Sequence, residues 1–348
     1  MGIEASIKTL AGKFDVPLSI ESITSIKSGH INSTYHLKNA LPNQPDVILQ
    51  KVNQQVFENV KHLMENQVLV TEHIQNQEKY RNLVAPLIPT KQGKYWLEYE
   101  GEVWRMHIFI KNKKTFETPK SAEICRKAGQ TYGTFLKALA EIPAAKIHTH
   151  IPDFHNIRFR LRQLDLAVER CDETRIANVE SVLSEIENYR QEMCSLFDTA
   201  TNGGFPIRIL HNDTKLSNVL IGTEELGTVI DMDTIMPGFV FYDTGDALRS
   251  IAVNTKEDDP NLGAIRMNPD YINAFIDGYV DGTEGILTDL EQKSIPHSGG
   301  YMAYIMAVRF LTDYLNGNVY YSISYPEHNV DRANNQLKVC SLFSSLDI

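Results

Sequence analysis

The chain has 348 residues, of which 42% are apolar and 22% charged, a composition typical of a globular protein with room for two lobes. A formal net charge of −10 argues against a nucleic-acid-binding protein, which would normally carry a basic face. The four cysteines lie far apart without a C-x-x-C pair, and the most apolar long stretch, YMAYIMAVRFL, is interrupted by Arg309 and too short to span a bilayer. The N-terminus also has no apolar core of signal-peptide length, so we expect a cytoplasmic protein that binds neither nucleic acid nor membranes.

The N-terminal part of the chain predicts a small sheet with one helix packed on it. Residues 23–50 alternate as strands do, with turns expected at 28–30 and at LPNQP (41–45). Apolar residues recur at helical spacing over 57–77, and residues 94–110 predict two strands around Glu100-Gly101.

The pattern changes after KNKKTFETP (111–119). Three later regions show helical periodicity or are mostly helical: 121–139, 176–200 and 269–346. The sequence therefore predicts an α+β protein with a β-rich N-terminal lobe, residues 1–112, and a larger helical lobe, residues 113–348.

A polar cluster interrupts the helical lobe at PIRILHNDTKLSNVLI (206–221), followed by TVIDMD (228–233). The two short apolar strands flank the turn GTEELG and can pair as a hairpin. That pairing would bring Asp213, Asn218 and Asp231 to the same end of both strands. Carboxylate and amide oxygens suit a hard cation, so this end predicts a Mg²⁺ site.

Several other chemistries are disfavoured by what the sequence lacks. Histidine and cysteine do not occur at the spacing of a structural zinc site, and we interpret HTH at His148–His150 as a surface loop. The chain contains no G-x-S-x-G nucleophile motif and no Walker A sequence, so any nucleotide must be held in another way.

The string H-x-D-x-x-x-x-N followed by I-D-x-D resembles the catalytic core of the aminoglycoside phosphotransferase and choline kinase group, whose fold is similar to that of protein kinases. More narrowly, HNDTKLSNVL, IDMDTIMPGFVFYDTGDALR, GHINSTY and VILQKVN resemble the N-acetylhexosamine 1-kinases, which phosphorylate the anomeric hydroxyl of GlcNAc or GalNAc. The resemblance spans most of the chain. It implies a bilobal kinase-like fold, with ATP and Mg²⁺ as cofactors and a sugar as substrate.

The resemblance also implies roles for individual residues. Asp213 matches the catalytic base, which also contacts the substrate hydroxyl, and Asn218 and Asp231 match the Mg²⁺ ligands. His211 matches a histidine that braces the catalytic loop. We expect Asp243 and Asp246 to hold this loop as helix N-cap and hydrogen-bond acceptors, a structural role. For Lys215, neutralisation of the transferring phosphoryl group and a solvated surface position stay open.

The phosphate-binding side of the N-terminal lobe departs from the family pattern. Asn32 and Ser33 occupy the place of the glycine-rich loop and are expected to contribute donors to the nucleotide. Gln50 stands where relatives carry a lysine or arginine, while strand alternation puts Lys51 on the opposite face. Whether Gln50 or Lys51 contacts the phosphates stays open, as does the acidic partner on the helix, Glu65 or Glu72.

The acceptor side is expected to involve Thr234, Arg309 and Tyr320, with Tyr321 as the alternative to Tyr320. Arg309 lies in an otherwise apolar helix, where a charge must be paired or bind something, and Asp313 is a structural alternative partner. Two other functions are considered: a kinase of another small alcohol of the homoserine, choline or aminoglycoside type, and a non-catalytic nucleotide-binding regulator. The oligomeric state is left open.

Overall fold

A computed structural model describes residues 3–26, 31–224 and 226–346; the turn predicted at Ser28–His30 lies outside these residues. The helices are α1 (Ile3–Ala11), α2 (Val60–Gln75), α3 (Ala122–Ala138), α4 (Ile157–Arg170), α5 (Glu173–Ala177), α6 (Glu180–Thr199), α7 (Val240–Ile251), α8 (Pro269–Thr283), α9 (Asp289–Leu315) and α10 (His328–Ser344). The strands are β1 (Ile20–Ile26), β2 (Ser33–Asn39), β3 (Val47–Val52), β4 (Leu97–Tyr99), β5 (Glu102–Ile108), β6 (Arg208–Leu210), β7 (Val219–Leu220), β8 (Thr228–Val229) and β9 (Met236–Gly238). Within the described ranges, no helix is both long and apolar enough to cross a bilayer.

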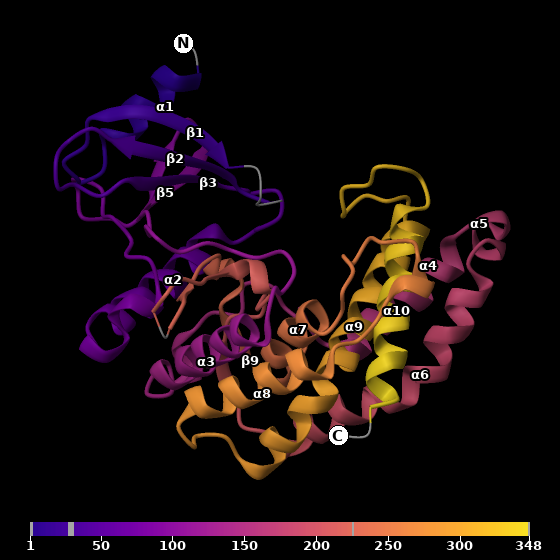
Figure 1. Cartoon of the computed structure of the whole chain (residues 1–348). Coiled ribbons are helices and arrows are strands. Elements are labelled where there is room, and N and C mark those ends of the chain that lie inside the picture. The colour runs from indigo at the N-terminus through magenta and orange to yellow at the C-terminus, as the bar shows by residue number, and fades with distance from the viewer. Residues whose placement is uncertain (1–2, 27–30, 225, 347–348) are drawn as a thin grey trace.

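The first five strands form an antiparallel sheet in the order β1-β2-β3-β5-β4. Apolar side chains alternate between its faces. Leu37, Leu49 and Met106 pack against α1, whereas Val52 and Val103 pack against α2. Figure 1 shows the two helices on opposite sides of this sheet. Because α2 also contacts the helical part of the chain, the inner face of the sheet is directed toward that part.

The helical part is built around α9, which packs against α4, α7 and α10. The helix begins with a capping box between Thr288 and Glu291, which satisfies backbone donors at its N-terminus. From Ser298 to Leu311 almost every side chain is buried, so α9 is a core helix; Arg309 alone is half-buried.

Helices α3 and α8 cross so closely that their backbones nearly touch. A Cβ at Gly129 would lie 2.1 Å from the carbonyl oxygen of Phe275, and one at Gly133 would lie 2.2 Å from that of Tyr279. Only glycine permits this approach. The crossing fixes α3, which leads out of the small lobe, against the base of the larger lobe.

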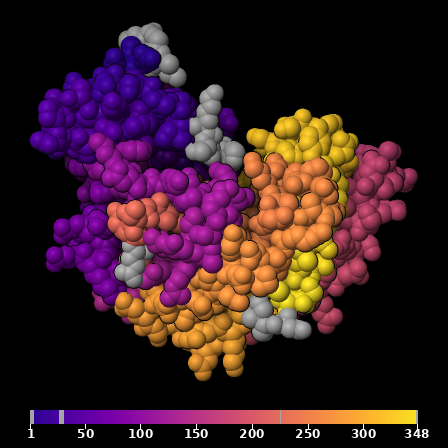
Figure 2. Space-filling model, in the orientation of Figure 1, coloured from indigo at the N-terminus to yellow at the C-terminus, as the bar shows by residue number. Residues whose placement is uncertain are grey.

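Two short antiparallel pairs, β6 with β9 and β7 with β8, lie between the sheet and the helices. The β7–β8 pair is the hairpin predicted from the sequence. A space-filling view shows a hollow between the N-terminal lobe and the orange and yellow surface of the helical part (Figure 2).

The predicted fold class is confirmed: a β-rich N-terminal lobe precedes a larger helical lobe. Four helices were not anticipated: α1, α4, α5 and α7. The last of these, VFYDTGDALRSI, has polar residues at Asp243, Asp246 and Arg249, three residues apart along one side, but this polar face is buried instead of exposed.

Candidate active site

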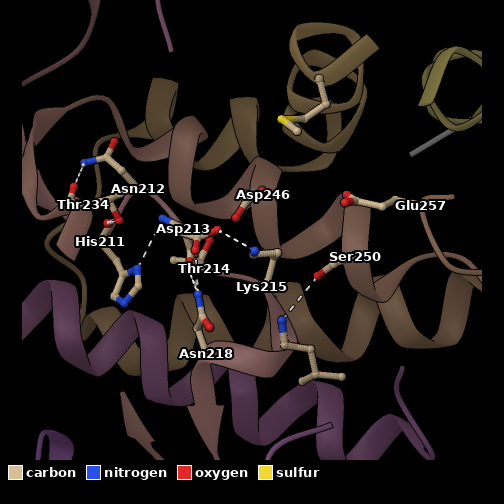
Figure 3. A network of polar contacts seen from close by, with 12 residues as sticks. His211, Asn212, Asp213, Thr214, Lys215, Asn218, Thr234, Asp246, Ser250 and Glu257 are labelled. Atoms are coloured by element: carbon tan, nitrogen blue, oxygen red, sulfur yellow. Dashed lines mark hydrogen bonds and ion pairs between the residues drawn. The ribbon is translucent and has the colours of Figure 1, made fainter. Parts of the chain in front are cut away.

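The polar cluster follows β6 and forms a tight loop (Figure 3). Asn212 adopts a positive φ of 62°, a conformation that asparagine tolerates better than most residues. Its side-chain amide donates to the carbonyl oxygens of Thr234 (3.1 Å) and Met236 (3.2 Å). The loop is therefore held to the segment that follows β8, and its direction at the next residue, Asp213, is fixed.

Asp243 on α7 braces the same loop from below. Its carboxylate accepts the backbone N–H groups of His211 (3.0 Å) and Asn212 (2.7 Å), and its carbonyl oxygen accepts the Thr214 hydroxyl. Burial raises the pKa of Asp243 to about 6, against the opposing effect of His211 and these two N–H groups.

The predicted N-cap role of these aspartates is not what the structure shows, since Phe239 precedes the first turn of α7 and Asp243 lies inside the helix. Asp246 does not bond to the loop backbone. It pairs with Arg249 (2.7 Å), and Arg249 also bonds to Glu257.

His211 lies behind the loop, where both ring nitrogens are used. Nε2 donates to the carbonyl oxygen of Ile230 (2.9 Å), and Nδ1 accepts the backbone N–H of Asp213 (3.2 Å). The imidazole thus joins the loop to the end of β8, as a bracing residue would.

Asp213 lies between Asn218 and Lys215 (Figure 3). Its Oδ2 accepts from Asn218 Nδ2 (2.8 Å), and its Oδ1 lies 3.3 Å from Lys215 Nζ. Burial alone would raise the pKa of Asp213, but Lys215, with help from His211 and Arg249, outweighs it and holds the pKa below its usual value. The side chain is therefore an oriented carboxylate at neutral pH.

Asp231 follows β8 with a φ of 60° and a ψ of 51°, a left-handed conformation that turns its side chain away from the strand. The carboxylate is accessible from the cleft, yet both lobes surround it and displace bulk water. This desolvation, together with the negative charges of Asp233 and Asp213, raises the pKa of Asp231 to about 7. A cluster of carboxylates short of positive charge is the environment in which a hard cation binds well.

A buried cation that the sequence reading missed lies on β5. Arg105 is 1% exposed and forms an ion pair with Asp233. Its Nε donates to Gln50 Oε1 (3.0 Å) on β3, and its Nη1 donates to Gln67 Oε1 (3.1 Å) on α2. Asn32 completes the set by donating to Asp233 Oδ2 (2.6 Å). The sequence does indicate this residue, because EVWRMHIFI contains one arginine among apolar residues of a predicted strand.

Gln50 and Lys51 lie on opposite faces of β3, as strand alternation predicts. Lys51 pairs with Glu102 (3.2 Å) on the far side from α2, whereas Gln50 faces Arg105 and also donates to the Thr34 hydroxyl (3.0 Å). Ser33 is exposed at the start of β2.

Neither proposed acidic partner on α2 faces Gln50 or Arg105. Glu65 pairs with Lys61 and His148, and Glu72 lies beside Tyr95. The helix instead contributes the neutral Gln67 to the arginine.

The predicted acceptor residues form a second group in the helical lobe. The guanidinium of Arg309 lies 5.2 Å from the ring centre of Phe154, 5.8 Å from that of Tyr320 and 5.7 Å from that of Tyr321. Asp313 is not its partner. That carboxylate accepts the backbone N–H groups of residues 319–321 and so shapes the turn that carries both tyrosines.

His155 connects the two groups. Its Nε2 donates to the carbonyl oxygen of Asn212 (3.0 Å), next to Asp213, and its ring packs on that of Phe154. Arg160, one turn into α4, is close to Arg309, and burial together with this second cation lowers the pKa of Arg160 to about 10. The acceptor side is therefore aromatic and positively charged.

Thr234 is buried beside the catalytic loop. Its hydroxyl donates to the carbonyl oxygen of His211 (2.7 Å), so the structure gives the side chain a structural partner within the loop. A sugar contact by this residue stays a prediction.

Comparison with known proteins identifies the surrounding architecture. The model of the "Phosphotransferase enzyme family" matches residues 22–280, well over half of the chain. Similar solved structures include a microcompartment-associated aminopropanol kinase (16% identity, 98% of this chain and 96% of that chain, TM-score 0.63). Others are an amicoumacin kinase in complex with AMP-PNP, Ca²⁺ and Ami (11%, 98% and 94%, 0.65) and a choline kinase from Cryptosporidium parvum (13%, 97% and 95%, 0.60). At these identities the likeness shows a shared fold.

Proposed function

The chain belongs to the phosphotransferase enzyme family, and we propose that it transfers the terminal phosphoryl group of ATP to the anomeric hydroxyl of an N-acetylhexosamine such as GlcNAc or GalNAc. In this proposal residues 1–112 bind the nucleotide and residues 113–348 carry the catalytic loop and the acceptor pocket. ATP and a divalent cation are supported by the amicoumacin kinase, a protein of the same fold that holds AMP-PNP and Ca²⁺.

The observation that carries the proposal is the Asp213 carboxylate, kept ionised by Lys215 and oriented by Asn218 (2.8 Å). Asp213 accepts the proton of the attacking hydroxyl. Phosphoryl transfer passes through a loose transition state in which orientation matters more than basicity, so a carboxylate of low pKa serves this role. The same hydrogen bond that orients Asp213 ties it to a candidate metal ligand.

Asp231 and Asn218 fit a Mg²⁺ ion by their chemistry. The Asn218 amide nitrogen is used by Asp213, which leaves its Oδ1 directed elsewhere, and Asp231 forms no ion pair among the described residues. When bound, Mg²⁺ neutralises charge on the phosphates. Lys215, beside Asp213, is placed to hold further negative charge near the transferred group.

On the nucleotide side of the site, the cation Arg105 lies within a network of hydrogen bonds, and Lys51 is paired with Glu102. We expect the exposed Ser33 to offer donors to the phosphates. Asn32 and Gln50 act through Asp233 and Arg105, respectively, and keep the segment that carries Asp231 in place.

The acceptor pocket favours a neutral, hydroxylated substrate. Sugars present apolar faces to aromatic rings and hydroxyl groups to charged donors, which matches Tyr320 and Arg309. The three rings that could cage a quaternary ammonium are covered by the Arg309 guanidinium, and Arg160 adds a second positive charge. A choline-type or aminoglycoside acceptor would be repelled here.

The test is consumption of ATP by the purified protein with a panel of free sugars and amino alcohols, followed by phosphorus NMR of the product. We expect turnover with an N-acetylhexosamine and a phosphate on its anomeric carbon. Phosphorylation of homoserine, choline or an aminoglycoside in preference to every hexosamine would replace the proposed substrate. Binding of ATP without turnover of any acceptor would point to a regulator.

A further inference from the structure

Three metal-binding side chains that the proposed reaction does not use lie together where α2 meets the segment after α3. His62 and Glu65 are one turn apart on α2, and His148 follows the short helix Ala144–Lys146. One donor atom of each lies within 4.8 Å of the donor atoms of the other two. The sequence reading placed His148 in a surface loop, and it is exposed, but its neighbours come from a distant helix.

We propose that His62, Glu65 and His148 form a site for a divalent transition metal, with Zn²⁺ as the ion that fits best. Two imidazoles and a carboxylate, with water in the open fourth position, are a donor set that tetrahedral Zn²⁺ accepts, whereas Mg²⁺ prefers oxygen ligands alone. His148 Nε2 lies 3.2 Å from Glu65 Oε2, and the two imidazole rings are stacked with centroids 4.0 Å apart. Because the two rings are nearly parallel (7°), at least one imidazole must rotate about its side-chain bonds before both lone pairs point to one ion.

The backbone of His148 is already fixed against α2. Asn66, which is 1% exposed, donates from Nδ2 to the carbonyl oxygen of His148 (2.8 Å) and accepts the N–H of the same residue (2.8 Å). Two bonds to the backbone of one residue hold the loop ligand beside the helix ligands before an ion arrives. A preformed site loses less conformational entropy on binding than one that must be assembled.

Asn59, which is not one of the three proposed ligands, is also expected to affect the affinity for Zn²⁺. Asn59 Nδ2 donates to His62 Nδ1 (2.8 Å), so the ring proton is on Nε2. Metal binding at Nε2 requires this proton to move to Nδ1 and the Asn59 amide to turn its Oδ1 toward Nδ1–H, which gives up the bond from the His62 backbone N–H to that oxygen (3.2 Å). A carboxylate at position 59 would accept Nδ1–H and favour the metal-binding tautomer, as carboxylates do behind zinc-bound histidines.

The ion would join α2 to a segment that touches the active site. Two residues after His148, His150 Nε2 donates to the carbonyl oxygen of Asp233 (2.7 Å), and Asn66 Nδ2 also donates to that of Ile235 (2.9 Å). Metal binding is therefore expected to stabilise the junction of the two lobes.

The experiment is calorimetric titration of the full chain with Zn²⁺ in the absence of nucleotide. We expect one class of sites in the wild type to weaken at least tenfold in His62→Ala and in His148→Ala, and to strengthen in Asn59→Asp. His297→Ala removes an exposed histidine of α9 and should leave the titration unchanged. Circular dichroism without metal verifies that each variant is folded, and Glu65→Gln provides a further variant that keeps a side-chain hydrogen bond to His148.

Anomalous scattering at the zinc edge from crystals grown with Zn²⁺ locates the ion directly. A peak between the three side chains supports the site. Titrations that are identical in the wild type, His62→Ala and His148→Ala, or a peak only elsewhere, would overturn it. Neither readout depends on phosphoryl transfer, so the outcome is independent of the proposed reaction.

Discussion

Arg105 of β5 and Asp233 of the segment after β8 form a buried ion pair that joins the sheet to the helical lobe. The positive charge expected on β3 thus stands on the neighbouring strand, where Gln50 and Gln67 orient it. Because Asp233 lies two residues beyond Asp231, the pair also fixes the position of a candidate metal ligand.

Removal of either member of this pair is expected to destabilise the protein. Arg105→Met leaves the Asp233 carboxylate buried without a cation, and Asp233→Asn does the reverse, each at a cost of about 3–5 kcal/mol in unfolding free energy. The double variant should lose less than the sum of the two. Urea unfolding measures all three, and removal of the exposed Lys38–Glu21 pair serves as the control, with a change below about 1 kcal/mol. Additive single effects would show that the pair contributes no coupling.

Asp213→Asn is expected to abolish most turnover while nucleotide binding persists. The amide keeps the shape of the side chain but cannot accept the substrate proton, so kcat should fall about 10²–10⁴-fold. Steady-state kinetics and nucleotide titration measure the two effects separately. Asp277→Asn, at an exposed position of α8, is the matched control. Unchanged kcat in Asp213→Asn would remove this residue from the reaction.

The sequence predicted the catalytic loop better than the rest of the site because the loop is local. His211, Asp213 and Asn218 lie within eight residues, and one hairpin adds Asp231. The pairing of Arg105 with Asp233 joins two lobes, and it cannot be predicted from the spacing of neighbouring residues in the sequence. For the same reason the i,i+4 spacing suggested Asp313 as the partner of Arg309, whereas this carboxylate holds the following turn.

Strands β1–β5 and helices α2, α3 and α6 were predictable from alternation and periodicity, since each has one apolar face. Helix α7 also separates polar from apolar residues, but its polar residues Asp243, Asp246 and Arg249 are buried, and the sequence pattern alone did not distinguish this helix from a loop.

Arg309→Met should act on the acceptor and not on ATP. Loss of a charged donor costs about 1.5–3 kcal/mol, so KM for the sugar should rise roughly 10- to 150-fold while KM for ATP stays constant. The variant also uncovers the rings of Tyr320, Tyr321 and Phe154, which should improve the weak binding of cationic alcohols. Kinetics with a hexosamine and with choline distinguish these effects. Equal changes in both KM values would place Arg309 outside the acceptor pocket.

Acid should destabilise the protein through His155. Burial lowers the pKa of His155 to about 3 from an ordinary value of 6.5, and its Nδ1 is buried without a hydrogen-bond partner among the described residues. Below pH 6.5 the imidazole of His155 therefore binds a proton in the unfolded chain but not in the native state. Stability is fully present above pH 6.5 and falls toward pH 3, by about 1.4 kcal/mol per pH unit for this group. Denaturant titrations at several pH values should show a shallower slope in His155→Gln, and an unchanged slope would contradict the assignment.

The close crossing of α3 and α8 should not tolerate a methyl group. Gly133→Ala would place a Cβ 2.2 Å from the Tyr279 carbonyl oxygen, and the helices must separate at a cost of about 1–3 kcal/mol or more. Thermal unfolding measures the loss. Gly12→Ala is the control, since its Cβ would make only ordinary contacts of 3.5 Å and longer. Similar melting temperatures for both variants would show that the crossing can relax.

Substitutions on the turn held by Asp313 and substitutions in the loop that carries Asp213 are expected to have different consequences. In the proposed reaction, the choice of acceptor depends on Tyr320 and Tyr321, whose backbone N–H groups this one carboxylate accepts, while the chemistry depends on a loop braced from α7. Residues on the turn can therefore be exchanged without disturbing Asp213. A lineage with this arrangement can acquire a new substrate by altering a few exposed positions, while the machinery that moves the phosphoryl group is inherited intact.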